Sequence, residues 1–177
     1  MLLTRIHGWR MRKAFVFDFD DTLATTKACV LVLRPSTPTC AGYIKELSPA
    51  EFNNYRLKNG ETFDFSQFRC SETIENGTPT ALMQLALDVY NEDHDVYILT
   101  ARSSDVADAI EKFLKLRGIE AEQVICVGDD DENTSIASCK MRSLVKLRAL
   151  YDKVYFYDDN KKNIELAKEA GVKSYLV

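Results

Sequence analysis

The stretch Ala14-Phe-Val-Phe-Asp-Phe-Asp-Asp-Thr-Leu23 (residues 14–23) decides the fold, because an apolar run passes directly into three aspartates. Its aromatic and β-branched residues predict a strand buried on both faces. Asp18 and Asp20 share one face of an extended chain, since side chains alternate along a strand. Two carboxylates that converge are costly unless a cation lies between them or one holds a proton. The stretch therefore indicates either Mg²⁺ binding or general acid catalysis.

Four further apolar runs alternate with amphipathic segments downstream of residue 23. This alternation predicts an α/β fold, a three-layer αβα sandwich around a five-stranded, parallel, Rossmann-like sheet. The five strands are expected at Ala14–Phe19, Asp95–Leu99, Gln123–Val127, Lys153–Tyr157 and Val172–Val177. The helices are expected at Pro79–Tyr90, with Thr78 as N-cap, and at Ser104–Arg117, Cys139–Leu150 and Lys161–Ala170.

Composition excludes several classes of protein. The 177 residues are 46% apolar and 28% charged, without an apolar run of membrane-spanning length, so neither disorder nor membrane insertion is expected. A net charge of −4 provides no general attraction to nucleic acid, so any such contact must be local. Five cysteines without a Cys-x-x-Cys pair indicate reduced thiols and a cytoplasmic location. Residues 1–12 are predicted to form an N-terminal tail, and either Met1 or Met11 is the start residue.

Polar side chains also follow two other predicted strands. Thr100 and Arg102 come after the second strand, and Asp158 and Asp159 come after the fourth. Lys140 lies 18 residues before Asp158, near the start of a predicted helix. A single acidic residue at a strand end is commonly a solvated turn former. Several polar groups at the carboxyl edge of one parallel sheet instead indicate a binding crevice.

With these residues in this order, the sequence resembles the haloacid dehalogenase (HAD) superfamily of phosphotransferases over residues 13–177, apart from an insertion. Asp18, Asp20 and Thr22 match the first motif, Asp-x-Asp-x-Thr, and Thr100 matches the second. Lys140 matches the lysine of the third motif, and Asp158 with Asp159 matches the terminal acidic pair. The aspartate at position 20 favours a phosphatase or phosphomutase over a dehalogenase or an ion-pumping ATPase.

The resemblance implies a role for each matched residue. Asp18 is expected to attack phosphorus, and Asp20 to act as general acid and base. Thr100 and Lys140 are expected to hold the phosphoryl oxygens. Asp21, Thr22 and Arg102 are predicted substrate contacts. Mg²⁺ is expected as the cofactor, and the residues predicted to hold it are Asp18, the backbone carbonyl of Asp20, Asp158 and Asp159.

Three residues or segments have two interpretations each. The acidic run Asp129–Glu132 also follows a strand, but in this family that strand is at the sheet edge, so we expect a solvated loop. Lys146 competes with Lys140, but it lies deeper in its helix and is expected on a solvated face. Arg102 resembles an arginine of polynucleotide phosphatase domains, or else it is a surface arginine at a helix start.

Residues 27–75, called the insertion below, interrupt the alternation and are predicted to form a flap or minimal cap that leaves the crevice open. Its aromatic residues either stack on a substrate or form a local core; they are Tyr55, Phe63, Phe65 and Phe68. The expected substrate is a phosphomonoester of a nucleotide or a polynucleotide 3′ end. A phosphoprotein or small-metabolite phosphatase is the alternative, and a non-catalytic receiver-like or phosphate-binding module is the alternative of another class. No protein partner can be inferred.

Overall fold

The structure, a computed structural model, describes residues 11–37, 40–130 and 133–177. Most of the N-terminal tail predicted for residues 1–12 therefore lies outside the described residues. In the described part, no helix is both long and apolar enough to cross a membrane.

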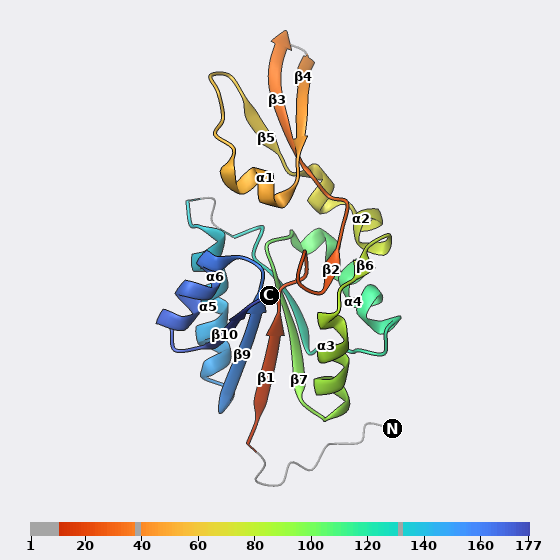
Figure 1. The fold of residues 1–177 in the computed structure, drawn as a ribbon, viewed down its shortest axis with the longest axis vertical. Helices are drawn as coiled ribbons and strands as arrows, with labels where there is room; N and C mark the ends of the chain where they lie inside the picture. The colour runs from red at the N-terminus through yellow and green to blue at the C-terminus, as the bar shows by residue number, and fades with distance from the viewer. Residues whose placement is uncertain (1–10, 38–39, 131–132) are drawn as a thin grey trace.

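Five parallel strands form the central sheet, in the order β10-β9-β1-β7-β8 (Figure 1). Their bounds are Lys13–Phe17 for β1, Asp95–Thr100 for β7, Gln123–Cys126 for β8, Lys153–Asp158 for β9 and Lys173–Leu176 for β10. Each of the five predicted strands is confirmed within a few residues. The strand that carries Asp18 lies in the middle, directly between β9 and β7.

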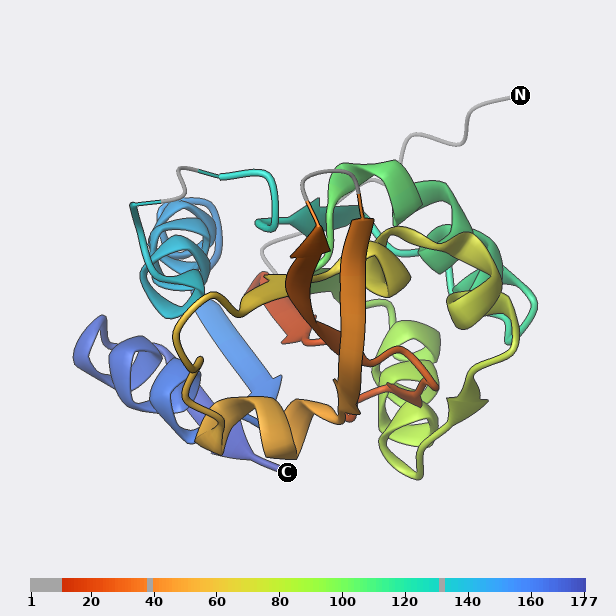
Figure 2. The ribbon, with the colours of Figure 1, turned by 90° about the horizontal axis from the view of Figure 1, so that it is seen from above.

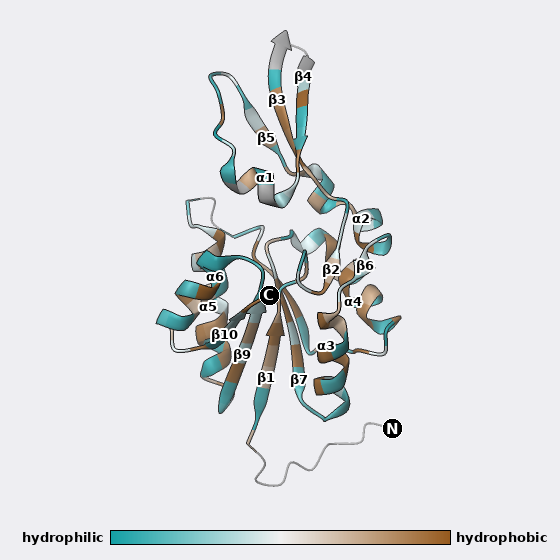
Figure 3. Ribbon diagram, in the orientation of Figure 1, coloured by the Kyte–Doolittle hydropathy of each residue, from teal (hydrophilic) through white to brown (hydrophobic). Residues whose placement is uncertain are grey.

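Helices cover both faces of this sheet, which confirms the three-layer sandwich (Figure 1). Helices α3 (Leu82–Asn91) and α4 (Ala107–Lys115) pack with Phe17 and Ile98 on one face. Helices α5 (Ile136–Arg148) and α6 (Lys161–Glu169) pack with Val16, Leu99 and Phe156 on the other. Apolar side chains thus point to both faces of the strands, as expected for a parallel sheet, and Figure 3 shows the apolar central strands.

Two predicted helix starts are wrong. Thr78–Pro79 is the short strand β6, which pairs with β2 (Ala24–Thr25), so Thr78 is no N-cap and α3 begins three residues after Pro79. Helix α5 starts earlier than predicted, because the Ser135 side chain caps it by accepting a hydrogen bond from the backbone of Ser138. Lys140 therefore lies in the second turn of α5 and not at its start.

The insertion forms a small antiparallel sheet above the carboxyl edge of the central sheet (Figures 1 and 2). Its strands, in the order β4-β3-β5, are β3 (Val30–Thr37), β4 (Cys40–Leu47) and β5 (Thr62–Asp64). The helical segments are α1 (Pro49–Asn54), a 3₁₀ helix at Ser66–Arg69 and α2 (Ser71–Glu75). Ser48 and Glu51 form a capping box at α1.

The loops after β7 and β8 touch where they leave the sheet. The backbone nitrogen of Gly128 donates to the carbonyl oxygen of Arg102 over 3.1 Å. A Cβ atom at position 128 would lie 2.4 Å from the carbonyl oxygen of Ala101 and 2.7 Å from the carbonyl carbon of Arg102. These are backbone atoms that cannot rotate away, so the contact requires glycine.

We expect Gly128→Ala to lower the free energy of unfolding by about 1–3 kcal/mol, because the added methyl group forces the two loops apart. Urea denaturation followed by circular dichroism measures this change. A urea midpoint equal to that of the parent protein would contradict this prediction, because it would show that the loops separate without a loss in the free energy of unfolding.

Candidate active site

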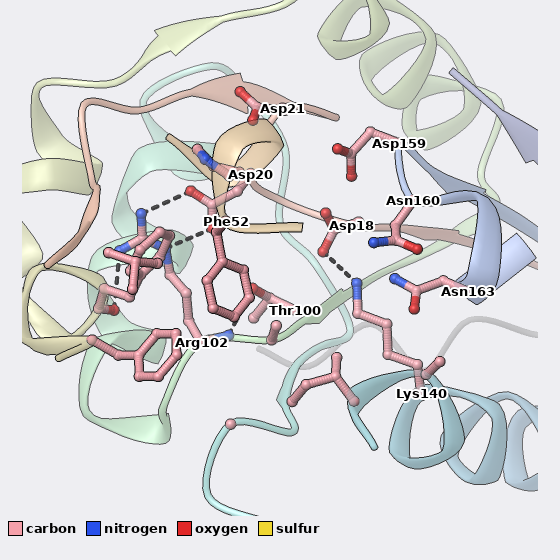
Figure 4. A pocket seen from close by; sticks show the side chains of 18 of the residues that line it. Asp18, Asp20, Asp21, Phe52, Thr100, Arg102, Lys140, Asp159, Asn160 and Asn163 are labelled. Carbon is pink, nitrogen blue, oxygen red and sulfur yellow. Dashed lines mark hydrogen bonds and ion pairs between the residues drawn. The ribbon is translucent and has the colours of Figure 1, made fainter. Parts of the chain in front are cut away.

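A buried lysine lies between two buried aspartates at the centre of the carboxyl edge. The Lys140 ammonium nitrogen is 2.7 Å from Oδ1 of Asp18 and 2.7 Å from Oδ2 of Asp158 (Figure 4 draws the first contact). Phe17 and Tyr157 are register partners in neighbouring parallel strands, so the next residues, Asp18 and Asp158, emerge side by side. All three side chains are at most 8% exposed. The predicted motif residues thus meet in space.

Burial and charge shift the pKa values of this cluster in opposite directions. Burial raises the pKa of Asp18 well above its usual range, and the nearby charge of Lys140 opposes that rise. Burial alone would lower the pKa of Lys140, but the carboxylates of Asp18 and Asp158 outweigh it and raise the pKa above its usual value. The lysine therefore stays charged and supplies a fixed positive charge beside Asp18.

Asp158 is held from several sides. The backbone nitrogen of Asn160 donates to its Oδ1 over 2.8 Å, and the Asn163 side-chain nitrogen lies 3.0 Å from each carboxylate oxygen. The sequence analysis did not single out Asn163. Its position near the start of the helix predicted after the acidic pair was the sequence signal that could have identified it.

An oxygen-rich corner adjoins this cluster. Ligand atoms of Asp18, Asp158 and Asp159 all lie within 4.8 Å of one another, which suits a hard cation such as Mg²⁺. Partial burial, with the charge of Asp158 next in importance, raises the pKa of Asp159 to about 6. Both oxygens of Asp158 already accept hydrogen bonds. Asp18 and Asp159 are therefore the residues whose carboxylate oxygens can best bind a cation.

Arg102 is buried, 1% exposed, and paired with Asp20. Its Nε is 2.7 Å from Oδ2 of Asp20, and its Nη2 is 2.8 Å from Oδ1 (Figure 4). The remaining donors reach Thr26, just before the insertion, and the carbonyl of Phe68 and the hydroxyl of Thr73 within it. All five N–H donors are engaged, so the interpretation as a surface arginine is wrong, and no donor is left for a substrate.

The other predicted substrate contacts differ in placement. Thr100 is buried, lines the pocket and accepts a hydrogen bond from the backbone of Arg102. Asp21 lines the pocket in a left-handed conformation, with φ of 56°. Thr22 does not line the pocket. Among the described residues, its hydroxyl is the buried side-chain polar atom that has no hydrogen-bond partner.

The two competing residues lie away from the cluster. Asp129 follows β8, the edge strand two places from β1, and accepts hydrogen bonds from the backbone and hydroxyl of Ser104 and from the hydroxyl of Ser103. These bonds lower the pKa of Asp129 to about 2. Asp129 is therefore a structural residue of the loop; Asp131 and Glu132 lie outside the described residues. Lys146 is exposed on α5.

A pocket of about 530 Å³ lies between the carboxyl edge and the insertion. Its lower wall contains Asp18, Thr100 and Lys140. Its upper wall consists of residues of the insertion. The apolar ones, called the roof below, are Val30, Pro49, Phe52, Phe65 and Phe68, and Arg69 lies in the same wall. The insertion thus covers the pocket, whereas an open crevice was predicted from the sequence.

Neither a family model nor a curated protein sequence matches this chain. Solved structures do match. A chain of the Pnkp1/Rnl/Hen1 RNA repair complex superposes with a TM-score of 0.59 at 13% identity, covering 94% of this chain and 42% of that chain. A haloacid dehalogenase-like hydrolase from Streptococcus pneumoniae superposes with a TM-score of 0.54 at 14% identity, covering 93% of this chain and 84% of that chain.

A third match is a HAD family enzyme from Bacteroides thetaiotaomicron, in complex with magnesium and inorganic phosphate, with a TM-score of 0.50 at 14% identity and 93% of each chain covered. This chain therefore shares the fold of these HAD-family enzymes, as the sequence resemblance predicted. This chain spans less than half of the matched chain from the RNA repair complex.

We expect Arg102→Ala to lower the free energy of unfolding by about 3–5 kcal/mol, because Asp20 would lose its buried partner. Arg102→Lys should recover only part of this loss, since an ammonium group cannot form the two-pronged contact. Urea denaturation measures both variants.

Lys112→Ala is the matched control, because it removes an exposed pair with Glu75 and should cost about 1 kcal/mol or less. Equal losses for Arg102→Ala and Lys112→Ala would contradict a special role for the Arg102–Asp20 pair.

Proposed function

We propose that this protein is a phosphomonoester hydrolase that works through a phosphorylated Asp18. The supporting observation is the contact of the Lys140 ammonium with both Asp18 and Asp158 at the carboxyl edge of the sheet. A carboxylate beside a permanently charged lysine can approach an anionic phosphate, because the lysine offsets the repulsion between them.

In this mechanism an oxygen of Asp18 bonds to phosphorus while the bond from phosphorus to the ester oxygen breaks. Asp20 donates a proton to the departing oxygen and later takes one from the water that hydrolyses the aspartyl phosphate. Arg102 fixes the position of the Asp20 carboxylate, and so acts as a positioning residue. Thr100 and Lys140 hold the phosphoryl oxygens as their charge redistributes.

The acidic corner fits a magnesium ion. We propose that Asp18, Asp159 and the backbone carbonyl of Asp20 contact it, with Asp158 behind them as the anchor of Lys140 and Asn163. A bound Mg²⁺ would supply positive charge that screens the phosphate from the attacking carboxylate. The matched B. thetaiotaomicron enzyme was crystallised with magnesium and inorganic phosphate, which supports this choice of ion.

For the substrate we propose a nucleotide or a polynucleotide-end phosphate, the 3′ end included. The aromatic roof and the match to a chain of an RNA repair complex support this class. A phosphoprotein or a small metabolite is the alternative substrate. A receiver-like or phosphate-binding module is the alternative of another class, and it would show no turnover. The cytoplasmic location stays a prediction from the cysteine pattern.

The basic test is phosphate release from p-nitrophenyl phosphate with Mg²⁺ and with EDTA. We expect activity only with Mg²⁺, and a loss of at least about 10³-fold in Asp18→Asn, because the amide is a far weaker nucleophile. Asp108→Asn, an exposed aspartate of α4, is the control and should keep full activity. Turnover that persists in Asp18→Asn would contradict the mechanism.

Lys140→Ala and Lys146→Ala separate the two lysines of α5. We expect Lys140→Ala to lower kcat by about 10²–10³-fold, because a charge aimed at the phosphate is removed. Lys146 is exposed, so its alanine variant should match the parent protein. Kinetic assays measure the rates, and circular dichroism checks that each variant is folded. A larger effect at Lys146 would overturn the assignment.

A further inference from the structure

The two walls of the pocket differ in chemistry. The lower wall carries the carboxylates and Lys140. The roof is apolar and contains three phenylalanines, of which Phe65 is 45% exposed. Apolar ring surface that stays in contact with water is unfavourable in free energy. An apolar group of a ligand that covers the ring would remove this surface from water.

The aromatic residues of the insertion contact its local core, the pocket, or both. Tyr55 and Phe63 pack into the local core of the insertion, with Val32 and Leu47. Phe65 lines the pocket and is not part of that core, whereas Phe68 and Phe52, a residue not predicted from the sequence, pack against the core and also line the pocket. Core packing and a place in the pocket wall, which the sequence left as alternatives, thus occur together in this set of rings.

The roof rings are held by one another. Phe52 meets Phe63 edge to face at 4.9 Å between ring centroids, and it meets Phe65 at 5.5 Å. The guanidinium of Arg102 lies 5.2 Å from the centroid of the Phe68 ring. In Figure 4 the Phe52 ring lies over the gap between Arg102 and Asp18. Rings that are fixed before binding lose little conformational entropy when a ligand stacks on them.

Charges limit what the roof accepts. Of the four cationic side chains in the lining, Lys140 and Arg102 are paired with the catalytic aspartates. Arg69 is paired with Asp105 and Asp129, and the exposed Lys162 is the fourth. The apolar residues of the roof carry no charge and Arg69 in the same wall is already paired, so the roof suits an uncharged, flat group better than further phosphates.

We propose that the roof is the subsite for the nucleobase of a nucleoside monophosphate, with the phosphate on Asp18 and the base stacked against Phe52 and Phe65. This inference rests on the proposed hydrolase function and specifies its substrate. The volume of about 530 Å³ falls in the range of sites for small organic ligands and exceeds what a phosphate with one small ring requires. A free nucleotide and the last nucleotide of an oligonucleotide both contain such a phosphate and base.

The test compares kcat/KM for adenosine 5′-monophosphate, adenosine 3′-monophosphate, a 3′-phosphorylated oligonucleotide, ribose 5-phosphate and phosphotyrosine. We expect the best adenine-containing substrate to exceed ribose 5-phosphate by about 10–100-fold, because base stacking on aromatic side chains is worth about 1–3 kcal/mol per base. The comparison of the oligonucleotide with the two mononucleotides distinguishes the two sources of the base. Equal rates for ribose 5-phosphate, or faster hydrolysis of phosphotyrosine, would overturn the inference.

Phe65→Ala tests the roof directly. It should lower kcat/KM for the adenine-containing substrate by about 10-fold and leave ribose 5-phosphate unchanged. The control is Tyr43→Ala, which removes an exposed ring of the insertion that does not line the pocket and should alter neither rate. An equal loss on both substrates in Phe65→Ala would mean that the ring acts on the fold and not on the base.

Calorimetry separates failure of this inference from failure of the proposed function. Binding of adenosine 5′-monophosphate, adenosine 3′-monophosphate and ribose 5-phosphate is measured on the Asp18→Asn protein, with and without Phe65→Ala. Tighter binding of an adenine nucleotide that is lost in Phe65→Ala supports the subsite, even if no substrate is turned over. Turnover of p-nitrophenyl phosphate without any preference for the base would uphold the hydrolase and refute the subsite.

Discussion

The contact of one lysine with two aspartates governs the arrangement of this site. Lys140 is buried in α5, and its charge is tolerated there only because Asp18 and Asp158 lie 2.7 Å away on both sides. That arrangement requires β1 and β9 to be neighbours in register, with α5 packed across them. The lower wall of the pocket is therefore a direct product of the parallel sheet and its crossover helix.

A second buried cation links this wall to the insertion. Arg102 leaves β7 and engages Asp20 on the core side, and its other donors reach Thr26 and the segment at Phe68–Thr73. Arg69 adds an exposed link from the insertion to Asp105 and Asp129. These contacts connect the insertion, which carries the roof, to the loops at the carboxyl edge of the central sheet. A single arginine thus contacts both Asp20, the proposed acid–base group, and the pocket-lining residue Phe68.

The roof explains why a short insertion can enclose a pocket. Its three strands have their own small core, around Val30, Val32 and Leu47, so the segment is a folded layer that presents Phe52 and Phe65 downward. The sequence predicted a flap or minimal cap here and not a three-stranded sheet, because antiparallel pairing between β3 and β5 joins residues about thirty positions apart. The enclosed pocket and its apolar character follow from that pairing.

The sequence by itself determined the strand and helix alternation, the five-stranded sheet and the placement of Asp18, Thr100 and Asp158 at its carboxyl edge, because periodicity and strand-end position are local properties of the chain. Lys140 was predicted from its match to the third motif of the family. The starts of α3 and α5 were missed, since strand pairing at Pro79 and a serine cap outweighed apolar spacing. Only the tertiary structure decided that Arg102 is buried against Asp20 and that Phe52 faces the pocket. Those outcomes depend on contacts between segments far apart in the chain, which no local pattern encodes.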